Sequence, residues 1–126
     1  MPITSELFGY GSLRSKRLRR RLLGREIKTV PAWLEGFASV QVAGSPYPGL
    51  VRAPGQKTVG ELLLGLRPRD LERLDRYEGT EYERRLVWVQ AQGRKHRAWV
   101  YCWRDRRRLA LKSRLLRLPR LPVLSK

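Results

Sequence analysis

The stretch PRDLERLDRYEGTEYERRLVWVQAQGRKHRAWVYCW, residues 68–103, combines the signals of a helix and of a β-hairpin. Proline is tolerated in the first turn of a helix, and an acid in that turn complements the helix dipole, so the spacing predicts a helix over 68–77. Gly79 is placed to end it. Residues 82–91 and 97–103 alternate apolar and polar side chains on either side of a QGRKH turn, which is typical of an antiparallel hairpin.

The preceding part of the chain mixes strands and helices in the same way. LFGY at 7–10 reads as a short buried strand, followed by a Gly-Ser turn and a basic helix over 13–23. Residues 27–42 predict strand, bend and strand, residues 45–55 a loop with one short extended piece, and residues 58–66 a further strand. The expected fold class is α+β: a small mixed barrel or bent sheet of about six strands with two or three helices.

The length of 126 residues suits one globular domain, expected over 1–104, with 105–126 as a basic C-terminal helix and tail. No apolar run approaches the length of a membrane span, and the start of the chain lacks the features of a signal peptide. A single cysteine, Cys102, excludes an internal disulfide framework. These features predict a cytoplasmic protein.

The charge is unusual, because 28 Lys and Arg residues stand against 11 Asp and Glu residues and give a net charge of +17. The excess is concentrated in Arg14–Lys28 and Arg104–Lys126. One interpretation is a surface for nucleic acid or another anionic partner. The other is two solvated helix faces, because the arginines interrupt leucines at helical spacing and no aromatic residues alternate with them. The sequence leaves both open.

Cysteine catalysis and metal binding are both disfavoured. If His96 and Cys102 share a strand, the six-residue separation places them roughly 20 Å apart, too far for a catalytic hydrogen bond. Cys102 is then a packed strand residue. With one histidine and one cysteine in the chain, we expect no metal site.

The turn after the first predicted strand, Gly9-Tyr10-Gly11, opens a helix as phosphate loops do. The third glycine of such loops is missing, since Arg14 stands there, so the nucleotide-binding interpretation is weak. A tight turn of this kind can still expose backbone N–H groups to a carboxylate or a developing oxyanion. The alternative is an ordinary strand-to-helix turn.

Among the acids of residues 74–82, Glu78 stands out. At about 100° per residue it falls near the middle of the apolar stripe of its helix, whereas Asp75 lies toward the edge and Glu81 lies beyond Gly79. A carboxylate on the apolar side loses solvation when ionised, which suits it to accept and return a proton near neutral pH. The alternative is that the helix frays at Tyr77 and leaves Glu78 in solvent.

Five segments, in the same order, resemble the gamma-glutamylcyclotransferase-like family: LFGYGSL (7–13), YPGLV (47–51), VGELL (59–63), LDRYEGTEYERRLV (74–87) and AWVY (98–101). The similarity spans roughly residues 6–103. The pairing of the Tyr-Gly-Ser-Leu turn with the Leu-Asp-x-Tyr-Glu-Gly block makes the resemblance specific. It implies a small barrel with a cavity, in which Glu78 is the catalytic acid and base.

The resemblance also implies that Tyr10, Gly11, Ser12 and Leu13 form the substrate-binding loop. Tyr82 is an expected cavity residue or an ordinary core tyrosine. The implied reaction is a cofactor-free intramolecular aminolysis of a small gamma-glutamyl amide, which closes 5-oxoproline and releases an amine. The alternative function is a catalytically inactive barrel that binds nucleic acid or an anionic surface through its basic segments.

Overall fold

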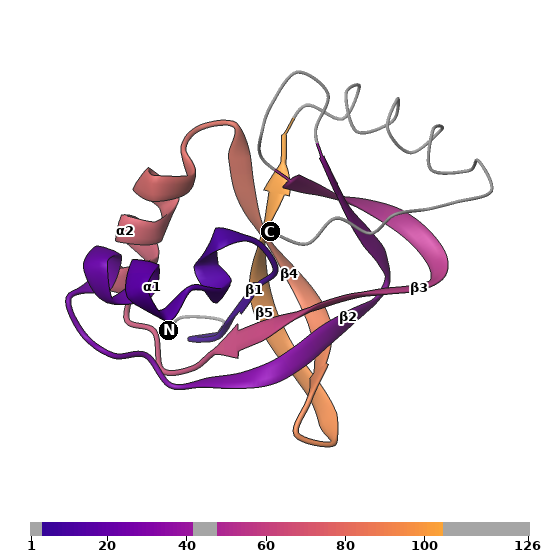
Figure 1. Cartoon of the computed structure of the whole chain (residues 1–126), viewed down its shortest axis with the longest axis horizontal. Coiled ribbons are helices and arrows are strands. Elements are labelled where there is room, and N and C mark those ends of the chain that lie inside the picture. Colours follow the sequence, from indigo (N-terminus) through magenta and orange to yellow (C-terminus); the bar gives the residue numbers. More distant parts are fainter. Residues whose placement is uncertain (1–3, 42–47, 105–126) are drawn as a thin grey trace.

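The structure is a computed structural model that describes residues 4–41 and 48–104. In this part of the chain five strands close into a barrel with the order β1-β3-β2-β4-β5 (Figure 1). Their bounds are β1 Leu7–Gly9, β2 Thr29–Gln41, β3 Pro48–Leu63, β4 Tyr82–Ala91 and β5 Arg94–Trp103. The short β1 closes the barrel, because it pairs antiparallel with β3 and parallel with β5. The predicted mixed barrel is confirmed, with five strands rather than about six.

The strand count differs because the two strands predicted within residues 27–42 form a single strand, β2, and because β3 begins at Pro48, ahead of the strand predicted over 58–66. The bend near Gly36 is a register shift between β2 and β3, in which the extra residues lie in β3: Gly36 has a φ of +82°, and β2 pairs with β3 on both sides of it. The predicted loop over 45–55 is wrong for residues 48–55, which belong to β3. Pro54 and Gly55, which suggested a loop, fall among residues 53–56, which have no partner in the β2–β3 register. Proline therefore removes no ladder hydrogen bond there.

Two α-helices, α1 Lys16–Leu23 and α2 Pro68–Glu78, lie on one side of the barrel (Figure 1). The predicted helix over 13–23 begins later than expected, because Ser15 caps α1 by accepting the Leu18 N–H at 3.2 Å. A separate 3-10 turn, Ser12–Arg14, precedes it. The helix predicted over 68–77 is confirmed and extends by one residue to Glu78.

Two large apolar clusters lie on opposite faces of the strands, because successive residues of a strand point to opposite faces, and a small third one contains Ala38, Val40 and Val51. The cluster inside the barrel contains Phe8, Tyr10, Ala32, Leu34, Leu50, Leu62, Val89, Ala91, Ala98 and Val100. The cluster between the barrel and the helices contains Leu7, Leu13, Leu23, Ile27, Leu63, Leu66, Leu71, Leu74, Tyr82, Tyr101 and Trp103. The second cluster fixes α2 against the outer face of the hairpin formed by β4 and β5.

The crossing of β1 and β3 depends on a glycine. A Cβ atom at Gly60 would lie 2.2 Å from the carbonyl oxygen of Gly9 and 2.9 Å from the ring of Phe8. No side chain fits at that distance, so glycine permits the close approach of the two strands. Because Gly9 leads directly into the turn at Tyr10, this contact also sets the position of that turn.

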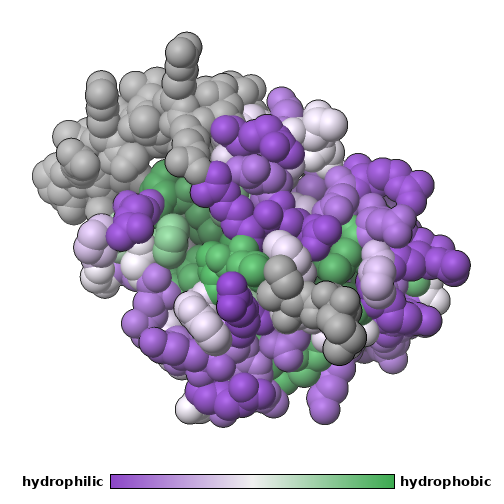
Figure 2. Space-filling view, turned by 180° about the vertical axis from the view of Figure 1, so that it is seen from behind, coloured by the Kyte–Doolittle hydropathy of each residue, from purple (hydrophilic) through white to green (hydrophobic). Residues whose placement is uncertain are grey.

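The hairpin predicted from residues 82–103 is confirmed, with a tighter turn at Gln92 and Gly93 than the predicted QGRKH segment. Seen from behind, hydrophilic residues cover much of the described surface and surround a central hydrophobic area (Figure 2). None of the helices in the described ranges is long and apolar enough to cross a membrane. The predicted C-terminal helix over 105–126, and with it the proposed domain boundary, lies outside the described residues.

Candidate active site

A cavity of about 270 Å³ lies where the turn after β1 meets the end of α2 and the start of β4. It is lined by Phe8, Gly9, Tyr10, Gly11, Ser12, Leu13, Tyr77, Glu78, Glu81, Tyr82 and Tyr101. All six residues to which the sequence assigns a role, Tyr10, Gly11, Ser12, Leu13, Glu78 and Tyr82, are in this wall. The fold thus brings together two motifs that are far apart in the sequence.

The turn after β1 contributes backbone donors to the cavity wall. Among the described residues, the N–H groups of Gly11, Ser12 and Leu13 donate to no protein acceptor. The next two N–H groups, those of Arg14 and Ser15, bond to the carbonyls of Gly11 and Ser12 at 3.0 and 2.9 Å. Successive N–H groups without a protein partner can bind an anion such as a carboxylate.

Glu78 is the last residue of α2 and is half-buried in the cavity wall. The helix does not fray before it, because the Gly79 N–H donates to the Asp75 carbonyl at 3.0 Å and Gly79 turns the chain with a φ of +88°. Glu78 is therefore not the fully solvated residue of the alternative interpretation. The preceding residue joins the two motifs, since the hydroxyl oxygens of Tyr77 and Ser12 are 2.9 Å apart.

A hydrogen-bond network forms a second wall of the cavity. The Tyr10 hydroxyl donates to the Tyr101 carbonyl at 2.7 Å, and the Tyr101 hydroxyl donates to Asp75 Oδ1 at 2.7 Å. Arg84 binds both oxygens of Asp75, at 2.7 and 3.2 Å, and its guanidinium lies 4.5 Å from the centre of the Trp99 ring. Asp75, which does not line the cavity, thus fixes the Tyr101 side chain, and the Tyr101 backbone in turn fixes Tyr10.

Both buried phenols are held in the protonated form. Burial raises the pKa of Tyr10 well above 10.0, and the nearby Tyr82, Cys102 and Glu78 side chains raise it further. Burial and the hydrogen bond to Asp75 likewise raise the pKa of Tyr101. Near neutral pH these groups can donate hydrogen bonds but cannot act as bases. The proton acceptors in the cavity wall are therefore the carboxylates.

The sequence did not assign a role to Tyr77, Glu81 or Tyr101, although all three line the cavity. Glu81 was set aside because it lies beyond the end of its helix, and a helical wheel carries no information past that point. Tyr101 belongs to the strand predicted over 97–103, but nothing in its alternation of apolar and polar residues shows that this strand reaches the turn after β1. Tyr82 has both expected roles, since it lines the cavity and packs edge-on against Trp103 at 5.2 Å.

Three other residues considered from the sequence, His96, Cys102 and Glu61, do not line the cavity. His96 is buried on β5 with its Nδ1 atom 3.0 Å from Glu6 Oε1, and Cys102 lies six positions along the same strand. Glu61 accepts a hydrogen bond from Arg19 at 3.3 Å, while Tyr47 lies outside the described residues. In the ranges that the structure describes, no three His, Cys, Asp or Glu side chains are grouped to hold a metal ion.

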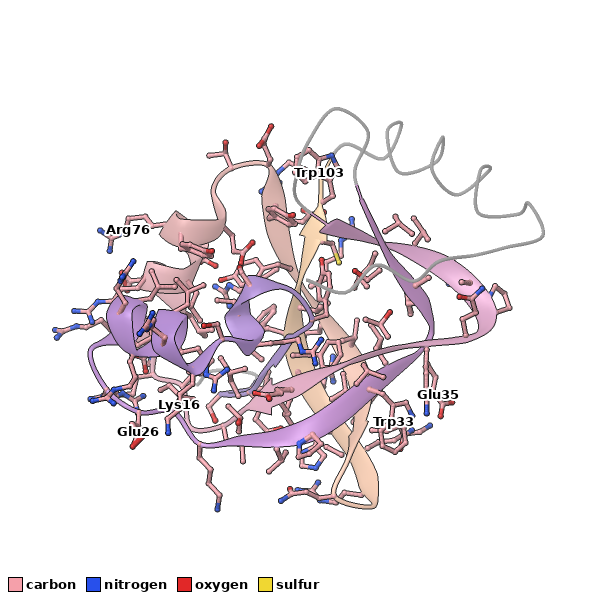
Figure 3. The ribbon with its side chains drawn as sticks, in the orientation of Figure 1. Lys16, Glu26, Trp33, Glu35, Arg76 and Trp103 are labelled. Atoms are coloured by element: carbon pink, nitrogen blue, oxygen red, sulfur yellow. The ribbon has the colours of Figure 1, made fainter. Side chains whose placement is uncertain are left out.

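The basic segment Arg14–Lys28 is less uniform than either sequence interpretation assumed. Arg19 is buried and donates to the Leu13 carbonyl at 2.8 Å, so it supports the turn rather than the surface. Lys16 and Glu26 form an exposed ion pair at 3.0 Å, and Arg76 projects from α2 (Figure 3). Binding of nucleic acid or an anionic surface through this segment stays a prediction, and the second basic segment lies almost entirely outside the described residues.

Comparison with known proteins agrees with this architecture. The sequence profile of a family described as "Gamma-glutamyl cyclotransferase, AIG2-like" matches residues 7–117. This chain belongs to that family. Among its relatives in Arabidopsis thaliana, the protein AIG2 C is 32% identical over 104 residues, which are 81% of this chain and 63% of that protein. AIG2-like protein D is 34% identical over 100 residues, 77% of this chain and 66% of the relative. The chain therefore spans slightly less than two thirds of the length of these AIG2-like relatives.

Solved structures support the same family fold. A solution structure of an Arabidopsis thaliana protein superposes with a TM-score of 0.74 at 29% identity, over 92% of this chain and 76% of that protein. A gamma-glutamyl cyclotransferase shares the fold with a TM-score of 0.66 at 18% identity, over 79% of this chain and 66% of that one. The AIG2-like chain thus has the cyclotransferase barrel, and the resemblance noted in the sequence is confirmed.

Proposed function

We propose that this AIG2-like chain is a gamma-glutamyl-amine cyclotransferase, which releases 5-oxoproline and a free amine. The observation that carries the proposal is that one cavity contains both a half-buried carboxylate, Glu78, and the backbone donors of the turn after β1. The first can transfer a proton and the second can hold an anion. Family membership supports the same chemistry.

The substrate would bind through its glutamyl end. Its α-carboxylate is a match for the N–H groups of Gly11, Ser12 and Leu13, which have no protein acceptor among the described residues. The cavity of about 270 Å³ is at the small end of ligand sites, which suits a glutamyl group better than a nucleotide. The hydrogen-bonded side chains of Tyr10 and Tyr101 would form an aromatic wall beside the bound glutamyl group.

The reaction needs only a proton transfer in addition to ring closure. The α-amine nitrogen of the substrate attacks its own γ-carbonyl carbon, a new C–N bond closes the five-membered ring, and the bond to the departing nitrogen breaks. Glu78 accepts the proton that the attacking nitrogen loses and returns it to the departing nitrogen, so that no water is consumed. Holding the amine against the carbonyl supplies much of the acceleration.

The test is turnover of gamma-glutamyl amides by the wild-type protein and by Glu78→Gln, with 5-oxoproline measured by mass spectrometry. The substitution keeps the shape of the side chain but removes its ability to take a proton. We expect product from the wild type and a decrease in kcat of at least about 100-fold in the variant, as is typical when a general acid-base group is lost. Glu72→Gln, which removes an exposed acid elsewhere on α2, is the matched control.

Retention of most activity by Glu78→Gln, with the fold verified by circular dichroism, would rule out this assignment. Failure of the wild type to release 5-oxoproline from any gamma-glutamyl amide in the panel would contradict the proposed function itself. In that case the inactive barrel, with its basic segments as a binding surface, would become the better hypothesis.

A further inference from the structure

The cavity differs in charge from the rest of the molecule. Although the whole chain carries a net charge of +17, the lining residues include two carboxylates, Glu78 and Glu81, and no lysine or arginine among the described residues. Glu78 already has a place in the proposed reaction. Glu81 does not, so its presence in the wall calls for a separate explanation.

Glu81 lies where the cavity meets solvent. Its side chain is exposed and lines the cavity, whereas Glu78 beside it is half-buried. Among the described residues, no side chain forms an ion pair or hydrogen bond with the Glu81 carboxylate. A carboxylate of this kind is available to a ligand at little cost, because no partner in residues 4–41 and 48–104 has to be displaced.

Arg104, whose backbone contacts Glu81, directs its side chain elsewhere. The Arg104 backbone N–H donates to the Glu81 carbonyl at 2.7 Å, but its guanidinium donates to the carbonyls of Thr80 and Tyr82 and to Glu83 Oε2, at 2.9, 3.0 and 3.3 Å. Glu83 also forms an ion pair with Arg85 at 2.7 Å, and Arg104 is held by three acceptors, none of which is the Glu81 carboxylate. The negative charge of Glu81 is left facing the mouth of the cavity.

This inference rests on the proposed function, which fixes the orientation of the substrate in the cavity. The glutamyl end binds at the N–H groups of the turn, the scissile bond lies at Glu78, and the departing amine leaves through the mouth. Glu81 is thus the charged residue that the amine portion passes. We infer that Glu81 is a specificity-determining residue, which selects gamma-glutamyl conjugates whose amine portion carries a positive charge and no carboxylate.

Two electrostatic effects compete here, and their ranges decide between them. The overall positive charge of the protein attracts anionic conjugates at long distance, but this field is largely screened beyond about 8 Å at physiological ionic strength. Glu81 acts at contact distance, where screening is weaker. An exposed ion pair of this kind contributes modestly, so we expect kcat/KM for a cationic conjugate about 2- to 5-fold above that for a neutral one. The advantage over an anionic conjugate is about 5- to 25-fold, because attraction is replaced by repulsion.

Three conjugates that differ only at the far end test this inference. In each, the gamma-glutamyl group is linked to an amine with four methylenes that end in an ammonium (from 1,4-diaminobutane), a methyl (from n-pentylamine) or a carboxylate (from 5-aminopentanoate). The measurement is kcat/KM for 5-oxoproline release at physiological ionic strength. The proteins are the wild type, Glu81→Gln, Glu81→Lys and the control Glu72→Gln.

We expect the wild type and Glu72→Gln to prefer the ammonium conjugate. Glu81→Gln should lose this preference while still turning over the methyl conjugate. Glu81→Lys should prefer the carboxylate conjugate. Equal kcat/KM values for the three conjugates in the wild type, or an unchanged preference in Glu81→Gln, would overturn the inference and leave the cyclotransferase activity standing. Equal loss of all three activities in Glu81→Gln would also overturn it, because a specificity residue does not act on the neutral conjugate. No product from any conjugate with the wild type would instead refute the proposed function.

Discussion

Gly60→Ala provides the sharpest test of how the fold positions the candidate site. Replacement of a glycine within a strand by alanine, where the backbone tolerates it, ordinarily stabilises a protein by about 0.4–1 kcal/mol, because the unfolded chain loses freedom. The structure predicts the opposite sign. The new Cβ atom would lie 2.2 Å from the Gly9 carbonyl oxygen, whereas contacts of real Cβ atoms essentially never fall below 3.0 Å, so β1 and β3 must separate by about 0.8 Å.

Neither of the two nearest groups can move freely. One is backbone, and the other is the ring of Phe8, which is 1% exposed inside the barrel. Over-packing of a tight core costs about 1–3 kcal/mol, and a contact with backbone belongs at the upper end of that range. A loss of about 3 kcal/mol corresponds to a decrease in Tm of about 10–15 °C for a domain of this size. The assay is thermal unfolding followed by circular dichroism.

The control is Gly24→Ala at the end of α1. Its φ of +72° disfavours alanine, but a Cβ atom there meets nothing within 4 Å, so only the conformational cost of about 1 kcal/mol applies. A Tm for Gly60→Ala equal to or above that of the wild type would refute the steric argument. Because Gly9 leads into the substrate-binding turn, we also expect turnover by the folded part of Gly60→Ala to decrease by up to about 100-fold.

Two further substitutions test the charged and phenolic groups. Burial opposes ionisation of Asp70, but the Arg67 N–H and the Arg25 guanidinium outweigh burial and hold the carboxyl pKa below its ordinary 3.8. The stability that the ionised carboxylate contributes is complete above pH 3.8 and is lost as the pH falls through the folded-state pKa. In denaturant unfolding at neutral pH, Asp70→Asn should lower the free energy of unfolding by about 1–3 kcal/mol relative to the wild type, and by less in strong acid. An equal difference at the two pH values would contradict this explanation. Tyr10→Phe should lower the free energy of unfolding by about 1–2 kcal/mol, because the buried Tyr101 carbonyl loses its hydrogen-bond donor. The shape of the pH–activity profile should stay the same up to about pH 10, because burial holds the Tyr10 pKa above that range. A profile that changes at lower pH would contradict the assignment of Tyr10 as a neutral donor.

The charge distribution separates two parts of this AIG2-like chain. Arginines dominate the exposed side of α1, yet Arg19 is turned inward and holds the carbonyl of Leu13 in the turn after β1. Two carboxylates, Glu78 and Glu81, in contrast line the cavity without a lysine or arginine among the described lining residues. Under the proposed function, a strongly basic protein would present a negatively charged cavity mouth to its substrate, so the net charge alone is a poor guide to the ligand of this site.

Local sequence predicted the elements whose signals are contained within one segment. The helix over 68–77 and the following hairpin were correct, because proline at the first helical position, Gly79 at its end and strict alternation in β4 and β5 are all short-range signals. Glu78 was identified in the same way, by its angle on the helix. The basic helix was placed correctly but began too early, since the capping role of Ser15 was missed.

Errors occurred where a strand depends on its partner. Pro54 and Gly55 read as loop residues, yet they form an irregular part of β3 opposite Gly36, and only the pairing with β2 shows this. Local propensity cannot detect a bulge, because the signal lies in the opposing strand.

The sequence by itself determined the fold class, the family resemblance and the six residues now found in the cavity wall, because each depends on short motifs or on periodicity. Only the tertiary structure decided that Tyr77, Glu81 and Tyr101 join them, that Arg19 is buried and that Gly60 fixes the turn. These features come from contacts between strands and helices distant in the chain. Their physical cause is the closure of the barrel, which places the end of β1 against α2 and β5.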